Sequence, residues 1–113
     1  MSRREDRVSI NDMLDHAREA VDLLGDIGRE ELREDRVLQL ALTRLIEIVG
    51  EAANRVTPEA RQRDSRIPWL AIVRMRNRLI HGYDVIDYDL LWNTITQDLP
   101  PLIAALCRIV EER

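Results

Sequence analysis

Apolar residues recur every three or four positions along most of this chain, and that spacing predicts helices. The first such stripe covers residues 10–24 and consists of Ile10, Met13, Leu14, Ala17, Val21 and Leu24. A strand would need apolar and polar residues to alternate, and no stretch of useful length does so. Only four Gly and four Pro interrupt the 113 residues. We therefore expect an all-α fold in a single domain spanning residues 1–113.

Residues that favour helix ends divide the first half of the chain. Ser9 is a good N-cap for the first helix, so residues 1–8 are expected to be frayed. That helix should end near Leu24, where glycines follow. A second and longer helix is expected over residues 29–56 because a broad apolar stripe runs through it.

The second half of the chain carries similar signals. Thr57, followed by proline, starts a short helix. A longer helix is expected over residues 68–82, with a glycine as its stop. Asp87 can cap a last long helix, which the prolines at 100–101 interrupt with a kink or a new first turn. The whole pattern predicts an up-and-down bundle of four main helices plus a short one.

Composition excludes several kinds of chemistry. All 17 basic residues are Arg, so a lysine Schiff base or a phosphate-loop lysine is impossible. Cys107 is the only cysteine, which excludes an internal disulfide and a thiolate metal cluster, and we expect it to be buried and inert. No metal ion and no cofactor are expected. The first ten residues lack the apolar segment that is typical of a signal peptide, and no apolar run approaches the ~18 residues that span a membrane. We expect a cytoplasmic protein with no membrane partner.

Positive charge is concentrated in residues 55–78, although the chain as a whole has a net charge of −4. This segment contains seven arginines and only two acidic residues, Glu59 and Asp64, so its local charge is +5 (seven minus two). Such a patch suits an RNA backbone, and Arg63, Arg66 and Arg74 are candidate RNA-binding residues. The ordinary alternative is a solvated face whose arginines pair with acidic helices.

The stretch "RMRNRLIHGYD" (residues 74–84) allows two interpretations. Arg76, Arg78 and His81 could simply cap a helix, because cations suit its C-terminus. They could also form a site: His is an acid or base near neutral pH, and Arg stabilises phosphoryl charge. On a regular helix Arg76 and His81 would point about 140° apart. They could converge if His81 lies at a frayed helix end, or if two copies of the helix meet across a two-fold axis.

The same residues resemble a known family. "RNRLIHGY" resembles the R-x4-H-x-Y motif of the HepT toxins, which belong to the HEPN superfamily of helical RNA-cleaving domains. The flanking segments "LTRLIEIVGEAANRV", "IPWLAIVRMRNRLIHGYD" and "DLPPLI" are also similar to HepT segments, in the same order. The resemblance covers roughly residues 9–110, which is nearly the whole chain.

The resemblance implies a homodimer, or a higher even oligomer, with a composite endoribonuclease site that needs no metal. Arg76 and His81 would be the catalytic pair, and Asn77 and Arg78 would support the site. Tyr83 would receive AMP from the partner antitoxin, a minimal nucleotidyltransferase called MntA, and this modification would silence the toxin. The partners would therefore be RNA and an MntA-like protein.

Two alternatives remain open on the sequence. The chain could be a non-catalytic helical module that binds RNA or a nucleotidyltransferase, or a structural dimer in which these residues only cap. The other candidates have ordinary interpretations. His16 and Tyr88 are expected at the edge of the core, and Glu47 and Glu51 on a solvated or Arg-paired face. Trp69 is expected in the core, with base stacking as the alternative.

Overall fold

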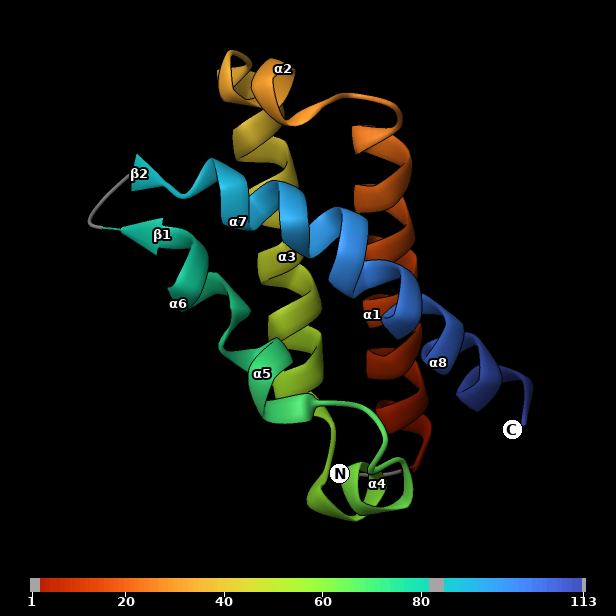
Figure 1. The fold of residues 1–113 in the computed structure, drawn as a ribbon. Helices are drawn as coiled ribbons and strands as arrows, with labels where there is room; N and C mark the ends of the chain where they lie inside the picture. The colour runs from red at the N-terminus through yellow and green to blue at the C-terminus, as the bar shows by residue number, and fades with distance from the viewer. Residues whose placement is uncertain (1–2, 82–84, 113) are drawn as a thin grey trace.

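The computed structural model describes residues 3–81 and 85–112, and for Arg3 and His81 it describes only the backbone. Two long antiparallel helices, α1 (Arg3–Leu24) and α3 (Arg36–Arg55), lie side by side at the centre (Figure 1). The segment with α5 (Trp69–Val73) and α6 (Met75–Leu79) covers one side of α3. The last segment, which ends in α8 (Leu99–Glu111), crosses in front and packs against α1. The predicted all-α bundle is confirmed.

Apolar stripes from these helices meet in one core. The first stripe is buried almost completely, and so are the apolar faces of α3 and α8. Trp69 is 7% exposed and donates its indole N–H to the Asp64 carbonyl at 3.1 Å. It is therefore a core residue and not a stacking surface. Among the described helices, none is long and apolar enough to cross a membrane.

The first helix begins earlier than predicted. α1 starts at Arg3, so Ser9 is not its cap, and residues 3–8, which we expected to be frayed, are helical. Ser9 is buried within the helix. The reason is a contact that is distant in sequence: the carboxylate of Asp6 accepts hydrogen bonds from the backbone and hydroxyl of Thr57.

The predicted helix over 29–56 is in fact two helices. A short α2 (Arg29–Arg33) precedes α3, and Asp35 caps α3 by accepting a hydrogen bond from the Leu38 amide at 3.0 Å. Gln39 then donates its side-chain amide to the carbonyls of Leu32 and Arg33 at 2.8 and 3.0 Å. These bonds occupy the free end of α2, so the chain can turn there.

Two other predicted helix starts are confirmed. Thr57 caps α4 (Pro58–Arg63) by accepting from the Ala60 amide, and Asp87 caps α7 (Tyr88–Asn93) by accepting from the Leu90 amide.

A π-helical turn, η1 (Thr94–Asp98), joins α7 to α8. In it the Leu99 amide bonds to the Thr94 carbonyl. Pro100 lies in the first turn of α8, where its missing N–H costs nothing. The new first turn expected at the prolines is therefore confirmed.

The predicted helix over 68–82 is wrong in two places. It breaks at Arg74, between α5 and α6, and it ends at Leu79. Two short strands follow, β1 (Ile80–His81) and β2 (Val85–Ile86), which pair antiparallel. The predicted stop at Gly82 lies outside the described residues.

Candidate functional site

Helix α6 presents polar residues on one side because its apolar residues are fixed on the other. Met75 and Leu79, one turn apart, are 7% and 0% exposed and hold the helix against α3. Between them Arg76, Asn77 and Arg78 are all exposed. Three of the predicted site residues thus lie together on the outer surface of one short helix.

The break before α6 coincides with a close approach of α5 to α3. Arg74 has backbone angles of φ −90° and ψ −1°, and its amide bonds to the Leu70 carbonyl at 3.1 Å. At Gly50 of α3, a Cβ atom would lie 3.1 Å from the Ile72 carbonyl oxygen. Glycine therefore allows the end of α5 to rest on α3, just before the break at Arg74.

The end of α6 is fixed by the hairpin. Ile80 is extended, and it pairs with Ile86 while the backbone of His81 pairs with Val85. The Asp87 amide donates to the Leu79 carbonyl at 2.8 Å, which occupies one of the free carbonyls at the helix end. His81 consequently follows the helix instead of lying in its last turn. The 140° separation of a regular helix does not apply to it, and Tyr83 lies outside the described residues.

Arg76 belongs to a cluster of alternating charges. Its Nε atom lies 3.4 Å from Oε1 of Glu47, on α3. Arg44 lies 3.2 Å from Oε2 of Glu47 and 3.3 Å from Oε1 of Glu51. Hydrogen bonds to Glu47 and then to Glu51 raise the pKa of Arg44 above its ordinary value. The predicted Arg-paired face at Glu47 and Glu51 is confirmed.

Sequence reasoning missed the contact between Glu47 and Arg76. The two residues lie on different helices, and no local pattern relates them. The Glu47–Glu51 spacing predicted a solvated or Arg-paired face, but it did not indicate which arginines would pair with these residues. Among the described residues, no group of three or more His, Cys, Asp or Glu side chains is placed to hold a metal ion.

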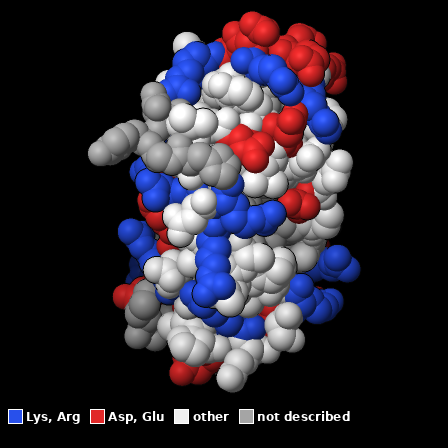
Figure 2. All heavy atoms as spheres, turned by 60° about the vertical axis from the view of Figure 1, so that its left-hand side comes forward, with Lys and Arg blue, Asp and Glu red and all other residues white. Residues whose placement is uncertain are grey.

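The arginines of the basic segment differ in their surroundings. Arg63, at the end of α4, Arg66, in the turn after it, and Arg74 are exposed. Arg61 instead donates to the Ala53 and Val56 carbonyls at the end of α3, so its role is to cap. Figure 2 brings the side of α5 and α6 forward and shows basic side chains gathered over its middle and lower parts. Acidic side chains gather at the top, the end where α2 lies.

The remaining candidates have local partners. His16 is half-buried, with Nδ1 2.7 Å from the Asp12 carbonyl oxygen, and Tyr88 packs at the edge of the core. The thiol of Cys107 accepts a hydrogen bond from Arg18 at 2.8 Å. These contacts agree with the ordinary interpretations of His16 and Tyr88. Cys107 is only partly buried, so the expectation that it would be buried is wrong.

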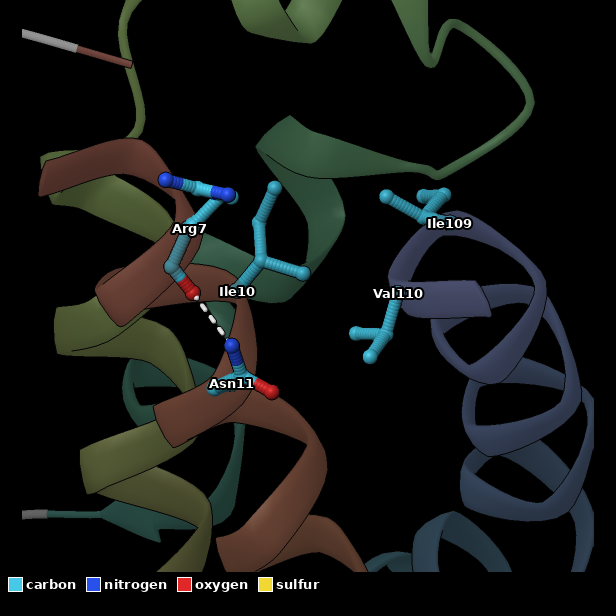
Figure 3. Close-up of a pocket in the computed structure, with 5 residues that line it drawn as sticks. All are labelled: Arg7, Ile10, Asn11, Ile109 and Val110. Atoms are coloured by element: carbon cyan, nitrogen blue, oxygen red, sulfur yellow. Dashed lines mark hydrogen bonds between the residues drawn. The ribbon is translucent and has the colours of Figure 1, made fainter. Parts of the chain in front are cut away.

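A hollow lies between the start of α1 and the end of α8 (Figure 3). Its lining is Arg7, Ile10, Asn11, Ile109 and Val110, and the Asn11 amide already donates to the Arg7 carbonyl. None of these residues belongs to α6, so the hollow is separate from the Arg76 cluster.

Comparison with known proteins decides the family. The family model described as "Ribonuclease HepT-like" matches residues 13–109, a range that includes all of α6 and the residues that follow it. The chain belongs to the HepT-like ribonuclease family. Several relatives are similar to it over most of their length. A protein of Thermococcus cleftensis named "Probable ribonuclease HepT" is 36% identical over 98 residues, which are 83% of this chain and 89% of that protein.

Two other relatives are similar to the chain over more than three quarters of their own length. "Putative RNase MJ1380" of Methanocaldococcus jannaschii is 33% identical over 102 residues, 90% of this chain and 94% of that protein. "Putative RNase TTE0752" of Caldanaerobacter subterraneus is 36% identical over 86 residues, 76% of this chain and 77% of that protein. No solved structure matches the chain.

Proposed function

We propose that this chain is a cytoplasmic, metal-independent endoribonuclease, the toxin of a toxin–antitoxin pair. The observation that carries the proposal is the family match over residues 13–109, within which Arg76, His81 and Tyr83 hold the positions of the R-x4-H-x-Y motif. The exposed side of α6 supports it, because Arg76 is accessible to a phosphate on a basic face.

The proposed reaction uses the RNA's own 2′-hydroxyl. A histidine takes the proton of that hydroxyl, and its oxygen attacks the adjacent phosphorus. Arg76 stabilises the negative charge that develops on the phosphoryl oxygens. The bond to the 5′-oxygen breaks, and a second histidine donates a proton to that oxygen. The products are a cyclic phosphate and a free 5′-hydroxyl.

The need for two histidines leads to the proposed dimer. One chain offers only His81 in this region, since its other histidine, His16, is on α1 and bonds to the Asp12 carbonyl. Two copies related by a two-fold axis would supply a base and an acid to one cleft. Asn77 and Arg78, exposed beside Arg76, would orient the RNA backbone.

Silencing by a partner completes the proposal. An MntA-like nucleotidyltransferase would transfer AMP from ATP to the hydroxyl of Tyr83, two residues after His81. The added phosphate charge and bulk would repel RNA from the site.

The test is cleavage of RNA in EDTA by the wild type, Arg76→Ala and His81→Ala, with Arg108→Ala on α8 as the matched control. Loss of a general acid–base is expected to lower the rate by roughly 100-fold or more. The Arg108 variant should cut normally. A His81→Ala protein that cuts RNA at the wild-type rate would contradict the proposal. RNA binding by the wild type without any cleaved product would favour the non-catalytic module.

The same assay tests the silencing. Wild type treated with ATP and the nucleotidyltransferase should stop cutting, whereas Tyr83→Phe should remain active because it lacks the acceptor hydroxyl. Equal inactivation of both proteins would show that AMP is not carried by Tyr83.

A further inference from the structure

Glu47 links the central helix α3 to the outer helix α6. Its side chain is only 19% exposed, whereas those of Arg44, Glu51 and Arg76 are 59%, 55% and 56% exposed. A carboxylate that is largely removed from water is stabilised by cationic partners. Glu47 has two of them, one on its own helix and one on α6.

The two oxygens of Glu47 approach different arginines. Oε2 lies against Arg44 and Oε1 against Arg76, so the carboxylate sits between the two guanidinium groups. Glu51, one turn further along α3, also pairs with Arg44. Arg76, in contrast, pairs with Glu47 alone among the carboxylates of residues 3–81 and 85–112.

The contact leaves Arg76 able to bind something else. Its closest atom to Glu47 is Nε, the inner nitrogen of the guanidinium group, and more than half of the side chain is exposed. A guanidinium has five N–H donors in a fixed plane, so one edge can rest on a carboxylate while another receives a phosphate. The carboxylate would then fix the plane in which the phosphate is bound.

Helix α6 has little else to orient this side chain. The helix has five residues, and Met75 and Leu79 fix its backbone but not the flexible side chain of Arg76. Holding a catalytic group in place before substrate binds removes an entropic cost from the reaction. The turn of α3 that carries Glu47 also carries Gly50, where α5 rests. One turn of α3 therefore contacts both the backbone of α5, which precedes α6, and the side chain of Arg76.

We infer that Glu47 is a positioning residue for Arg76, holding its guanidinium in the orientation that receives the scissile phosphate. The inference rests on the proposed function. It differs from two other roles for Glu47. A competitor for phosphate would hinder RNA, so its removal would raise activity. A purely structural carboxylate would change stability and leave the turnover of the folded protein unchanged.

The experiment compares Glu47→Gln with Glu51→Gln by RNA cleavage under single-turnover conditions, with saturation curves to separate rate from binding. Each variant removes one negative charge, but only the first removes the contact with Arg76. Glu47→Gln is expected to lower the rate at saturating RNA by roughly 10- to 100-fold. RNA binding should be unchanged or tighter, since the site gains positive charge. Glu51→Gln should behave as the wild type.

A second arm asks whether Glu47 acts through Arg76. In an Arg76→Ala background, Glu47→Gln should cause no further loss, because the side chain it positions is gone. If Glu47→Gln does not fold, as judged by a thermal melt, Glu47→Asp carries the test. That variant keeps the charge but shortens its reach, and should lower the rate without weakening binding.

Three outcomes would overturn the inference: equal rates for the two glutamine variants, a faster Glu47→Gln, or a loss that is fully additive with Arg76→Ala. Each of these is compatible with an Arg76→Ala protein that cuts RNA far more slowly than the wild type but still measurably, in which case the proposed function stands. An Arg76→Ala protein that cuts RNA at the wild-type rate would instead contradict the proposed function itself.

Discussion

Asp6 shows how one buried carboxylate can anchor the start of a chain. It is 3% exposed, and it accepts hydrogen bonds from the Thr57 amide at 2.9 Å and the Thr57 hydroxyl at 2.7 Å. The same hydroxyl oxygen accepts from the Ala60 amide and so caps α4. Asp6 therefore connects the first turns of α1 to the start of α4, which lies 51 residues later.

Replacing Asp6 with Ala should destabilise the protein. The amide and hydroxyl of Thr57 would lose their acceptor in a partly buried position, which costs about 1–3 kcal/mol. Urea unfolding followed by circular dichroism measures the difference. Asp15→Ala, at an exposed position on the same helix, is the control and should change stability by less than about 0.5 kcal/mol. Equal stability of the two variants would show that the Asp6 contacts contribute nothing.

At the scale of elements, the segment from α5 to β2 could be predicted from the sequence only in part. Apolar spacing located the helical segment correctly because packing against α3 follows that spacing. The ends of α6 depend on contacts with residues elsewhere in the chain. Ile80 is extended because it pairs with Ile86, and α5 stops where it meets Gly50. A two-residue strand has too few residues to show any alternation, so periodicity could not reveal it.

Gly50→Val tests the contact between α3 and α5. Helix propensity alone would not penalise this change, since glycine is a poor helix former. The larger side chain should nevertheless lower stability by about 1–3 kcal/mol, because a backbone carbonyl already lies 3.1 Å from the Cβ position. Thermal unfolding checks this, with Glu51→Val on the exposed side of α3 as the control. A Gly50→Val protein as stable as the wild type would mean that α5 can move away freely.

At the scale of the whole molecule, arginines gather on one face although the net charge is −4. The count of arginines in residues 55–78 indicated a basic face, and Figure 2 shows one. The count could not distinguish Arg61, which caps α3, from Arg63 and Arg66, which face solvent. The sequence also could not reveal the partner of Arg76, because Glu47 lies on another helix and only folding brings the two together.

RNA binding should therefore depend on salt through the exposed arginines. Arg63→Ala, Arg66→Ala and Arg74→Ala are each expected to make the plot of log affinity against log salt shallower by about 0.7, the value for one contact to a single-stranded phosphate. Fluorescence anisotropy with a labelled RNA, at several salt concentrations, gives the slopes. Arg108→Ala on α8 should leave the slope unchanged. Unaltered slopes in all three variants would place the RNA on another face.

The π-helical turn at Thr94–Asp98 has a consequence for how the length of this chain can change. An α-helix advances about 100° per residue, so losing one residue inside α8 would rotate every later side chain by that angle. Leu106 and Ile109 would then leave the core. A π turn holds one residue more than an α turn, and it can close to an α turn when that residue is lost. Residues 94–98 are thus the place where the last helical segment can shorten by one residue while both of its ends keep facing the core.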